Sequence, residues 1–174
     1  MVSDNDEGCA TVVFHHHGLA ARRMGCGEVG TDFEYCTAKR APQFDQYVEQ
    51  NKVPPIALLE DGWLLSCHHC QHQIKDEERD EEENTPLDQV VVVGDAVYCN
   101  QQCKESQDRE KQKSNEVFKT FKENVKTARP DLEFTDFKGE WPWITKTACF
   151  RFPGSQYGGS VRYDDGEIQW SVAN

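Results

Sequence analysis

The sequence predicts a mixed α+β fold in three parts, and three observations support this. Residues 1–62 alternate short strand-like and helix-like stretches, residues 63–113 carry two close pairs of cysteines, and residues 114–174 carry alternating apolar residues between glycine-containing turns. Alternation of apolar and polar residues indicates half-buried strands, whereas apolar residues three and four apart indicate a helix. We therefore expect a small α/β part, a metal-binding centre, and a long helix packed on an antiparallel β-meander.

The first part has the predicted order β-α-β-α-β-β. Strands are expected at 11–14 and 31–36, helices at 18–24 and 42–52, and a β-hairpin at 56–65. The hairpin is predicted because Asp61-Gly62 lies between two apolar runs, and Asp-Gly favours tight turns. Gly25 and Gly27 are expected to weaken the first helix.

This order, with a proline before the third strand, resembles that of thioredoxin and glutaredoxin domains. The resemblance implies a Cys-x-x-Cys pair directly after the first strand, where a helix N-terminus lowers the thiol pKa. The chain has His15-His16-His17-Gly18 in that place. Thiol–disulfide catalysis is therefore not expected.

Two cysteine pairs dominate the second part: Cys67-x-x-Cys70 and Cys99-x-x-x-Cys103, with 28 residues between them. Each pair is short enough to bind one ion from one side, and four soft thiolates suit tetrahedral zinc. The alternatives are four buried cysteines without a metal, or two disulfides. Residues 1–8 are polar and acidic, unlike a secretory signal, so we expect a reducing cytoplasm, where disulfides are rare. We predict one structural Zn²⁺ in a closed four-thiolate shell.

The surroundings of the second pair support this prediction. A hairpin at 90–98 should turn at Gly94-Asp95 and lead into Cys99, and Asn100 should cap a helix whose first turn carries Cys103. Over about residues 63–112 the pattern resembles the FCS-like group of treble-clef zinc fingers, through Gly94-Asp-Ala-Val-Tyr-Cys-Asn-Gln-Gln-Cys-Lys104 in particular. The resemblance implies a metal-binding finger and no particular partner. An acidic insertion at 76–84 makes the spacer longer than is usual in that group.

The longest predicted helix runs from Cys103 to Arg129, because no Gly or Pro interrupts it and Pro130 ends it. Its first half is polar, and an N-cap at Ser114 or Asn115 would allow a break between the halves. One face of its second half is apolar: Val117, Phe118, Phe121, Val125 and Ala128. This face should cover strands at 132–137, 144–152, 161–163 and 168–172, with Cys149 in the core.

The aromatic residues of the third part allow two interpretations. We expect them to form the core and rim of the sheet, and the alternative is a platform on which nucleic-acid bases stack. They are Trp141, Trp143, Phe150, Phe152, Tyr157, Tyr163 and Trp170.

The histidines also allow two interpretations. We expect His68, His69 and His72 to be exposed beside the first cysteine pair. Cys9, Cys26, Cys36 and the run His15–His17 could form a second metal site, but their spacing matches no known ligand pattern. We expect them to be surface imidazoles and small buried thiols instead.

Composition limits the function. The net charge is −12, and residues 76–83 contain seven acidic residues and one basic residue, which is typical of a solvated loop. No apolar run is long enough to span a membrane, so a soluble, cytoplasmic protein is expected. No catalytic motif is present, and we expect no enzyme and no small-molecule substrate.

Three functions remain as hypotheses. The first is a zinc-stabilised interaction or regulatory protein that binds a protein or nucleic acid, as a bacterial or phage accessory factor. The second is an acidic inhibitor or nucleic-acid mimic that acts on a basic protein. The third is an enzyme that uses His15–His17.

Overall fold

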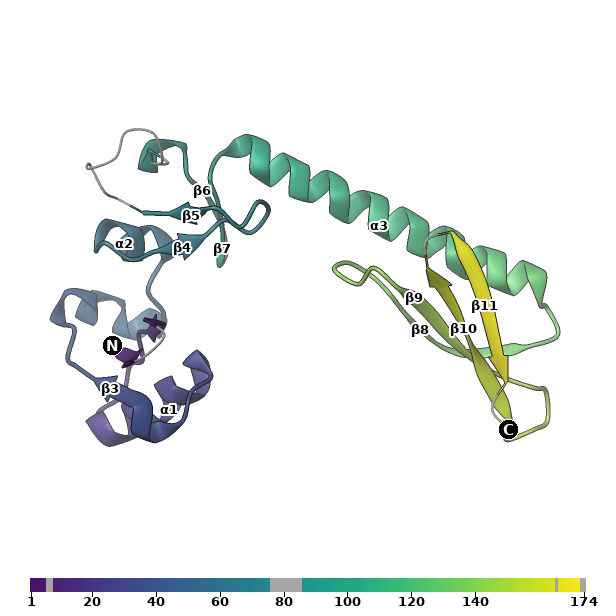
Figure 1. The fold of residues 1–174 in the computed structure, drawn as a ribbon, viewed down its shortest axis with the longest axis horizontal. Helices are drawn as coiled ribbons and strands as arrows, with labels where there is room; N and C mark the ends of the chain where they lie inside the picture. The colour runs from purple at the N-terminus through teal and green to yellow at the C-terminus, as the bar shows by residue number, and fades with distance from the viewer. Residues whose placement is uncertain (6–7, 76–85, 165, 173–174) are drawn as a thin grey trace. The chain divides into compact units, whose positions relative to one another are not determined.

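The computed structural model describes residues 1–5, 8–75, 86–164 and 166–172. The fold is mixed, with one long helix and small antiparallel sheets, as predicted (Figure 1). It forms two compact units, Met1–Cys99 and Asn100–Asn174. The finer boundaries at residues 62 and 113 stay predictions, and the acidic insertion at 76–84 lies outside the described residues.

The first unit begins with a three-stranded antiparallel sheet of order β2-β1-β3. The strands are β1 (Val2–Asp4), β2 (Ala10–Thr11) and β3 (Cys36–Ala38). Helix α1 (Gly18–Val29) covers this sheet and ends at Gly30, which has a φ of 77°. Val2, Cys26 and Cys36 form the buried core between helix and sheet.

This arrangement corrects the thioredoxin-like order. The central strand β1 was not predicted, the strand expected at 11–14 is shorter, and β1 pairs antiparallel with both neighbours. Half of the strand expected at 31–36 is a 3-10 turn, η1 (Phe33–Tyr35), followed by β3. The ring of Phe33 packs outward under the guanidinium of Arg22, 4.0 Å away, so its alternation with Tyr35 does not reflect a buried strand face.

The prediction of a hairpin at 56–65 is wrong, because its expected first strand is helix α2 (Pro55–Glu60). Pro55 occupies the first turn, where its fixed φ suits a helix. The Asp-Gly pair ends this helix: Gly62 has a φ of +83°, its N–H donates to Leu59 O at 2.9 Å, and Trp63 N–H donates to Leu58 O at 3.0 Å. These two bonds form a Schellman cap.

Two 3-10 segments and two pairs of short strands complete the first unit. The helix predicted at 42–52 is helical, but as a 3-10 helix, η2 (Pro42–Gln50), and η3 (Leu87–Gln89) is a single 3-10 turn. Strands β4 (Leu65–Ser66) and β5 (Gln73–Ile74) form one antiparallel pair. The hairpin predicted at 90–98 is confirmed as β6 (Val91–Val93) and β7 (Ala96–Tyr98).

The second unit is helix α3 (Gln101–Ala128) on a four-stranded antiparallel meander. The strands are β8 (Glu133–Lys138), β9 (Lys146–Arg151), β10 (Gly158–Asp164) and β11 (Glu167–Val172), in the order β11-β10-β9-β8. The second half of α3 lies over one face of this sheet, and its first half extends beyond it (Figure 1). The long helix, its end before Pro130 and the antiparallel meander agree with the prediction.

The core of this unit contains Phe118, Phe121 and Val125 from the predicted helix face, with Ala148 and Val161 from the sheet. The other two residues of that face, Val117 and Ala128, are exposed. Cys149 is also exposed, because alternation along β9 turns Ala148 and Phe150 toward α3 and Cys149 to the opposite face. Its prediction as a core residue is wrong.

The aromatic residues divide between core and surface. Phe150 is buried and its ring contacts Phe134 and Trp170, as expected for core and rim. Trp143 and Tyr157 are exposed. Among the described helices, none combines the length and apolar character needed to cross a membrane.

Candidate metal centre

The first cysteine pair lies on a tight turn between β4 and β5. The N–H of Cys67 donates to His72 O at 2.8 Å, and the N–H of Gln71 donates to Cys67 O at 3.0 Å. Gln71 has a φ of 62°, a left-handed conformation that closes the turn. The turn therefore folds the chain back on itself around the sulfur of Cys67, which is completely buried.

Strand β7 holds this turn beside the second cysteine pair. The N–H of His68 donates to Val97 O at 2.8 Å, and the ring of His68 lies 6.2 Å from that of Tyr98. The two-residue turn at Gly94-Asp95 reverses the chain so that β7 leads directly into Cys99. The contact therefore brings the start of one pair next to the start of the other.

The helix cap positions the last cysteine. Asn100 has extended backbone angles, and its Oδ1 accepts a 3.0 Å hydrogen bond from the N–H of Cys103. This bond satisfies one of the free N–H groups at the start of α3 and orients the first turn. Cys99 and Cys103 thus lie on either side of a defined cap, as the sequence predicts.

These elements bring the four predicted ligands together. The Sγ atoms of Cys67, Cys70, Cys99 and Cys103 all lie within 4.8 Å of one another. Those of Cys70 and Cys99 are 3.6 Å apart, which is much longer than the S–S bond of about 2.05 Å in a disulfide. Four sulfurs at about 2.3 Å from one tetrahedral ion would be about 3.8 Å apart. The cluster therefore has the dimensions of a four-thiolate metal site.

The surroundings of Cys67 also favour its negatively charged thiolate, which is the form that binds a cation. Burial raises the pKa of the Cys67 thiol, but hydrogen bonds from the backbone N–H groups of Cys70, Cys99 and His69 outweigh this and lower it to about 6. One of these bonds, from Cys99 N–H to Cys67 Sγ, is 3.5 Å long. Burial and the neighbouring thiols of Cys70 and Cys67 raise the pKa of Cys99 to about 12. One thiolate is thus present before the metal, which would displace the remaining protons.

The cluster can hold a soft or borderline cation such as Zn²⁺, and the other predicted candidates do not join it. Among the described residues it is the one group of three or more His, Cys, Asp or Glu side chains arranged for a metal. His68 and His72 are exposed, as expected, and His69 is half-buried. His15–His17 are exposed and Cys26 and Cys36 are buried in the core of the first unit, and in the described part of the chain they do not come together in such a group.

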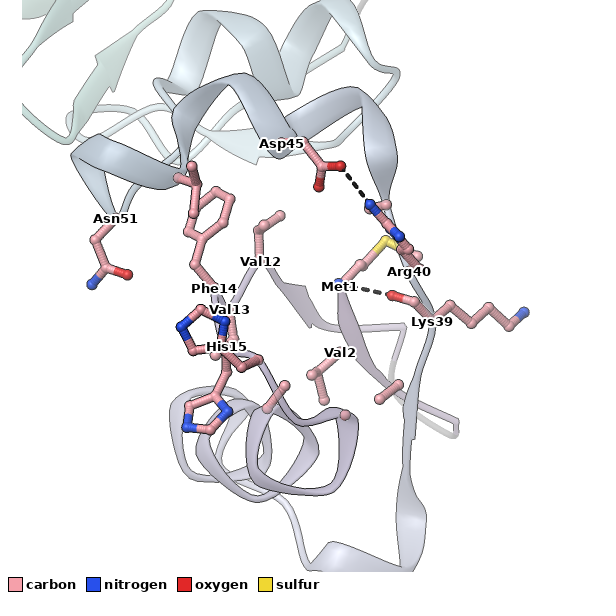
Figure 2. A pocket seen from close by; sticks show the side chains of 16 residues that line it. Met1, Val2, Val12, Val13, Phe14, His15, Lys39, Arg40, Asp45 and Asn51 are labelled. Atoms are coloured by element: carbon pink, nitrogen blue, oxygen red, sulfur yellow. Dashed lines mark hydrogen bonds and ion pairs between the residues drawn. The ribbon is translucent and has the colours of Figure 1, made fainter.

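A cavity of about 620 Å³ lies in the first unit, beside this histidine run. Its wall is apolar and polar in nearly equal measure, with Val12 and Phe14 among its apolar side chains, and His15 and His16 border it. Figure 2 shows the ion pair of Arg40 with Asp45 on the opposite side, 2.7 Å long, and the side chain of Lys39 directed away. The sequence contains no signal for this cavity, because separate segments form it.

The sequence predicts the four sulfur ligands but not the groups that support them. The backbone donors to Cys67 and the contact of His68 with Val97 depend on how the turn folds, and a ligand spacing does not encode this. Asn100 is the exception, since a cap residue before a helix is recognisable. Comparison of the chain with family models, curated proteins and solved structures finds no match.

Proposed function

We propose that this chain is a zinc-stabilised interaction protein, in which Cys67, Cys70, Cys99 and Cys103 bind one structural Zn²⁺. The supporting observation is the grouping of four sulfurs within 4.8 Å. Four thiolates fill a tetrahedral shell and leave no position for a reactive water. The ion would therefore hold the fold together, and the function would lie in the surfaces that it organises.

We further propose that about residues 63–112 form a treble-clef finger. A turn with two ligands, a β-hairpin leading into the third ligand, and a helix carrying the fourth follow one another in the order that this finger requires. Each hairpin of this region has strands of only two or three residues. Such short hairpins are marginal in water, so a metal contributing on the order of 10 kcal/mol would decide whether they form.

The binding role is supported by what the finger exposes. His68 and His72 project from the cysteine turn, and the first half of α3 is polar and largely exposed. A surface of this kind contributes little to stability, whereas a partner could contact it. We propose that the partner is a protein or nucleic acid; that the chain is a bacterial or phage accessory factor stays a prediction.

The test combines metal analysis with partner capture. The tagged chain, purified from its native host, should contain one zinc per chain, and a partner should copurify with it. Cys67→Ser should lose both zinc and partner, while Cys149→Ser, at an exposed cysteine of the sheet, should keep both. A partner that binds the zinc-free chain equally well, or a zinc-free native protein, would contradict the proposal.

One observation favours a second candidate, an acidic inhibitor or nucleic-acid mimic. Residues 1–99 contain seven Lys or Arg against nineteen Asp or Glu, whereas residues 100–174 contain twelve of each. The whole charge of −12 therefore belongs to the first unit, as it would in a protein that binds a basic surface. Replacing the acidic residues of 76–83 by Ser and Gln should abolish binding to a basic partner without loss of zinc.

A hydrolytic or redox role for His15–His17 is the weakest of the three hypotheses, and we propose that the chain is not an enzyme. His15 Nδ1 accepts a 3.0 Å hydrogen bond from the N–H of His17, so its role includes shaping the local turn. Replacing the three histidines by Gln should leave zinc content and partner binding unchanged. An activity lost in that variant would favour the enzyme instead.

A further inference from the structure

The loop between β8 and β9 exposes two adjacent apolar side chains. Trp143 is 69% exposed and Ile144 is 84% exposed, more than any other large apolar residue that the structure describes. Single exposed apolar residues are common on protein surfaces. Two adjacent ones at the tip of a loop, one of them tryptophan, are the residues that interfaces use as anchors.

The backbone of this loop is held from several sides. The N–H of Trp143 donates to Glu140 O at 2.9 Å, and the N–H of Trp141 donates to the side chain of Asn115 on α3 at 3.2 Å. Lys146 Nζ donates to Trp143 O and to Ser114 Oγ. Ser114 and Asn115 therefore attach the loop to α3. The sequence offers these two residues as N-caps for a break in the helix, which does not occur.

Two residues that hold the loop, Lys146 and Gly139, have unfavourable surroundings or an unusual backbone conformation. Lys146 is only 2% exposed, and burying an ammonium is unfavourable unless it gains hydrogen bonds. Gly139, where the loop begins, has a φ of +129°, and a Cβ there would lie 2.7 Å from Lys146 Cα. Gly139 is therefore required by its φ and by the close approach of the Lys146 backbone, and the buried Lys146 serves the loop conformation through its bond to Trp143 O.

We propose that Trp143 and Ile144 are a preformed anchor that inserts into an apolar pocket of a partner protein; this rests on the proposed function as an interaction protein. A loop already fixed in its bound shape loses little conformational entropy on binding. The indole N–H of Trp143 calls for a hydrogen-bond acceptor at the bottom or edge of that pocket. The partner pocket is thus apolar with at least one such acceptor.

The charge of the surroundings favours a protein over a phosphate-rich partner. Residues 100–174 contain equal numbers of acidic and basic residues, so this unit has no excess of positive charge for nucleic acid or for an anionic membrane. Asn115, which holds the loop, also lines a shallow groove on α3 whose charged residues are of both signs. They are Asp108, Lys111, Glu116 and Lys119. Asn115 joins this groove to the loop, and charged residues of both signs beside an apolar anchor are typical of a protein–protein interface.

The test begins with photo-crosslinking from the tip of the loop. A benzophenone amino acid at position 144, in cells that express the zinc-loaded chain natively, should give one discrete protein adduct. The same probe at Tyr157, another exposed loop residue of this unit, should not. The identified protein is then purified, and its affinity for wild type and variants is measured by calorimetry.

We expect Trp143→Ala to weaken this affinity about thirtyfold or more, and Tyr157→Ala to leave it unchanged. Equal affinity for wild type and Trp143→Ala would overturn the anchor while leaving the proposed function intact, whereas no partner for the zinc-loaded wild type would contradict the function itself. Binding that depends on Trp143 to anionic lipid vesicles, to oligo-dT, or to a second copy of the chain in sedimentation would also overturn the proposal.

Discussion

The ammonium nitrogen of Lys146 on β9 lies 2.7 Å from the hydroxyl oxygen of Ser114 in the middle of α3 and donates a hydrogen bond to it. Lys146 belongs to the row of β9 that faces the helix, in line with Ala148 and Phe150. A charged residue thus takes the place of a core residue at the end of the sheet. This position makes the stability of the second unit dependent on pH.

Burial lowers the pKa of Lys146 below its ordinary value of 10.5. In the unfolded chain the amine binds its proton more tightly, so its contribution to the free energy of unfolding rises as pH increases from the lowered value toward about 10.5. Urea unfolding of wild type and Lys146→Met at several alkaline pH values should show the difference moving in favour of wild type. The same comparison with Lys138→Met, at an exposed lysine of β8, should show no such movement.

Removing the metal should unfold one region selectively. Strands β4 to β7 have little apolar core of their own apart from Ile74, Val97 and Tyr98, whereas β8 to β11 share the core of α3 around Phe121. A zinc chelator should therefore abolish amide-exchange protection at 65–75 and 91–104 and leave that of β8–β11. The expected loss is on the order of 10 kcal/mol of apparent folding free energy. Protection that persists in both regions would mean that the cysteine turns fold without a metal.

The cap residue Asn100 should affect both the stability of α3 and the affinity for zinc. Asn100→Ala removes the acceptor for the N–H of Cys103 and should cost about 1 kcal/mol of stability at the start of α3. Because the same bond orients the turn that carries Cys103, zinc affinity should also fall several-fold in competition with a chromophoric chelator. Asn124→Ala, at an exposed position within α3, is the control: it should leave zinc affinity unchanged and should not lower stability, because alanine is the better helix former.

The cysteine centre was predictable because its signals are local. Ligand spacing, the Gly94-Asp95 turn and the Asn100 cap each lie within a few residues, and each has one dominant structural meaning. The long helix and the meander were predictable for the same reason, since their apolar periodicity extends over many residues. The metal ligands therefore needed no knowledge of distant contacts.

The wrong or missing predictions have two causes: some local patterns are compatible with two structures, and some elements have no recognisable pattern. Asp61-Gly62 suits both a hairpin turn and a helix end, and the cap of α2 used the second. Strand β1 has three residues, too few for a periodic pattern, and its pairing with β2 and β3 depends on tertiary contact. The exposure of Trp143 could not be predicted either, because Trp141, two residues earlier, is half-buried and no residue pattern distinguishes the two.

Helix α1 contains two glycines, Gly25 and Gly27, whose replacement by alanine distinguishes the effect of helix propensity from the effect of packing against β1. A Cβ on Gly25 would lie 2.4 Å from the Cβ of Val2, which is completely buried, whereas a Cβ on Gly27 would have no neighbour within 4 Å. Alanine is favoured over glycine within a helix by up to about 1 kcal/mol. Gly27→Ala should therefore raise the free energy of unfolding of the first unit by up to that amount in urea titrations.

Gly25→Ala should have the opposite effect, because the overlap with Val2 forces α1 away from β1. Overpacking of this kind costs about 1–3 kcal/mol, which exceeds the gain in helix propensity. If Val2 is changed to Gly, its Cβ and both γ carbons are absent and the space for the new methyl group returns, so Gly25→Ala should cost less in that background than in wild type. Equal effects of Gly25→Ala and Gly27→Ala would show that α1 does not pack on β1 through this glycine, and the role of β1 as central strand would have to be revised.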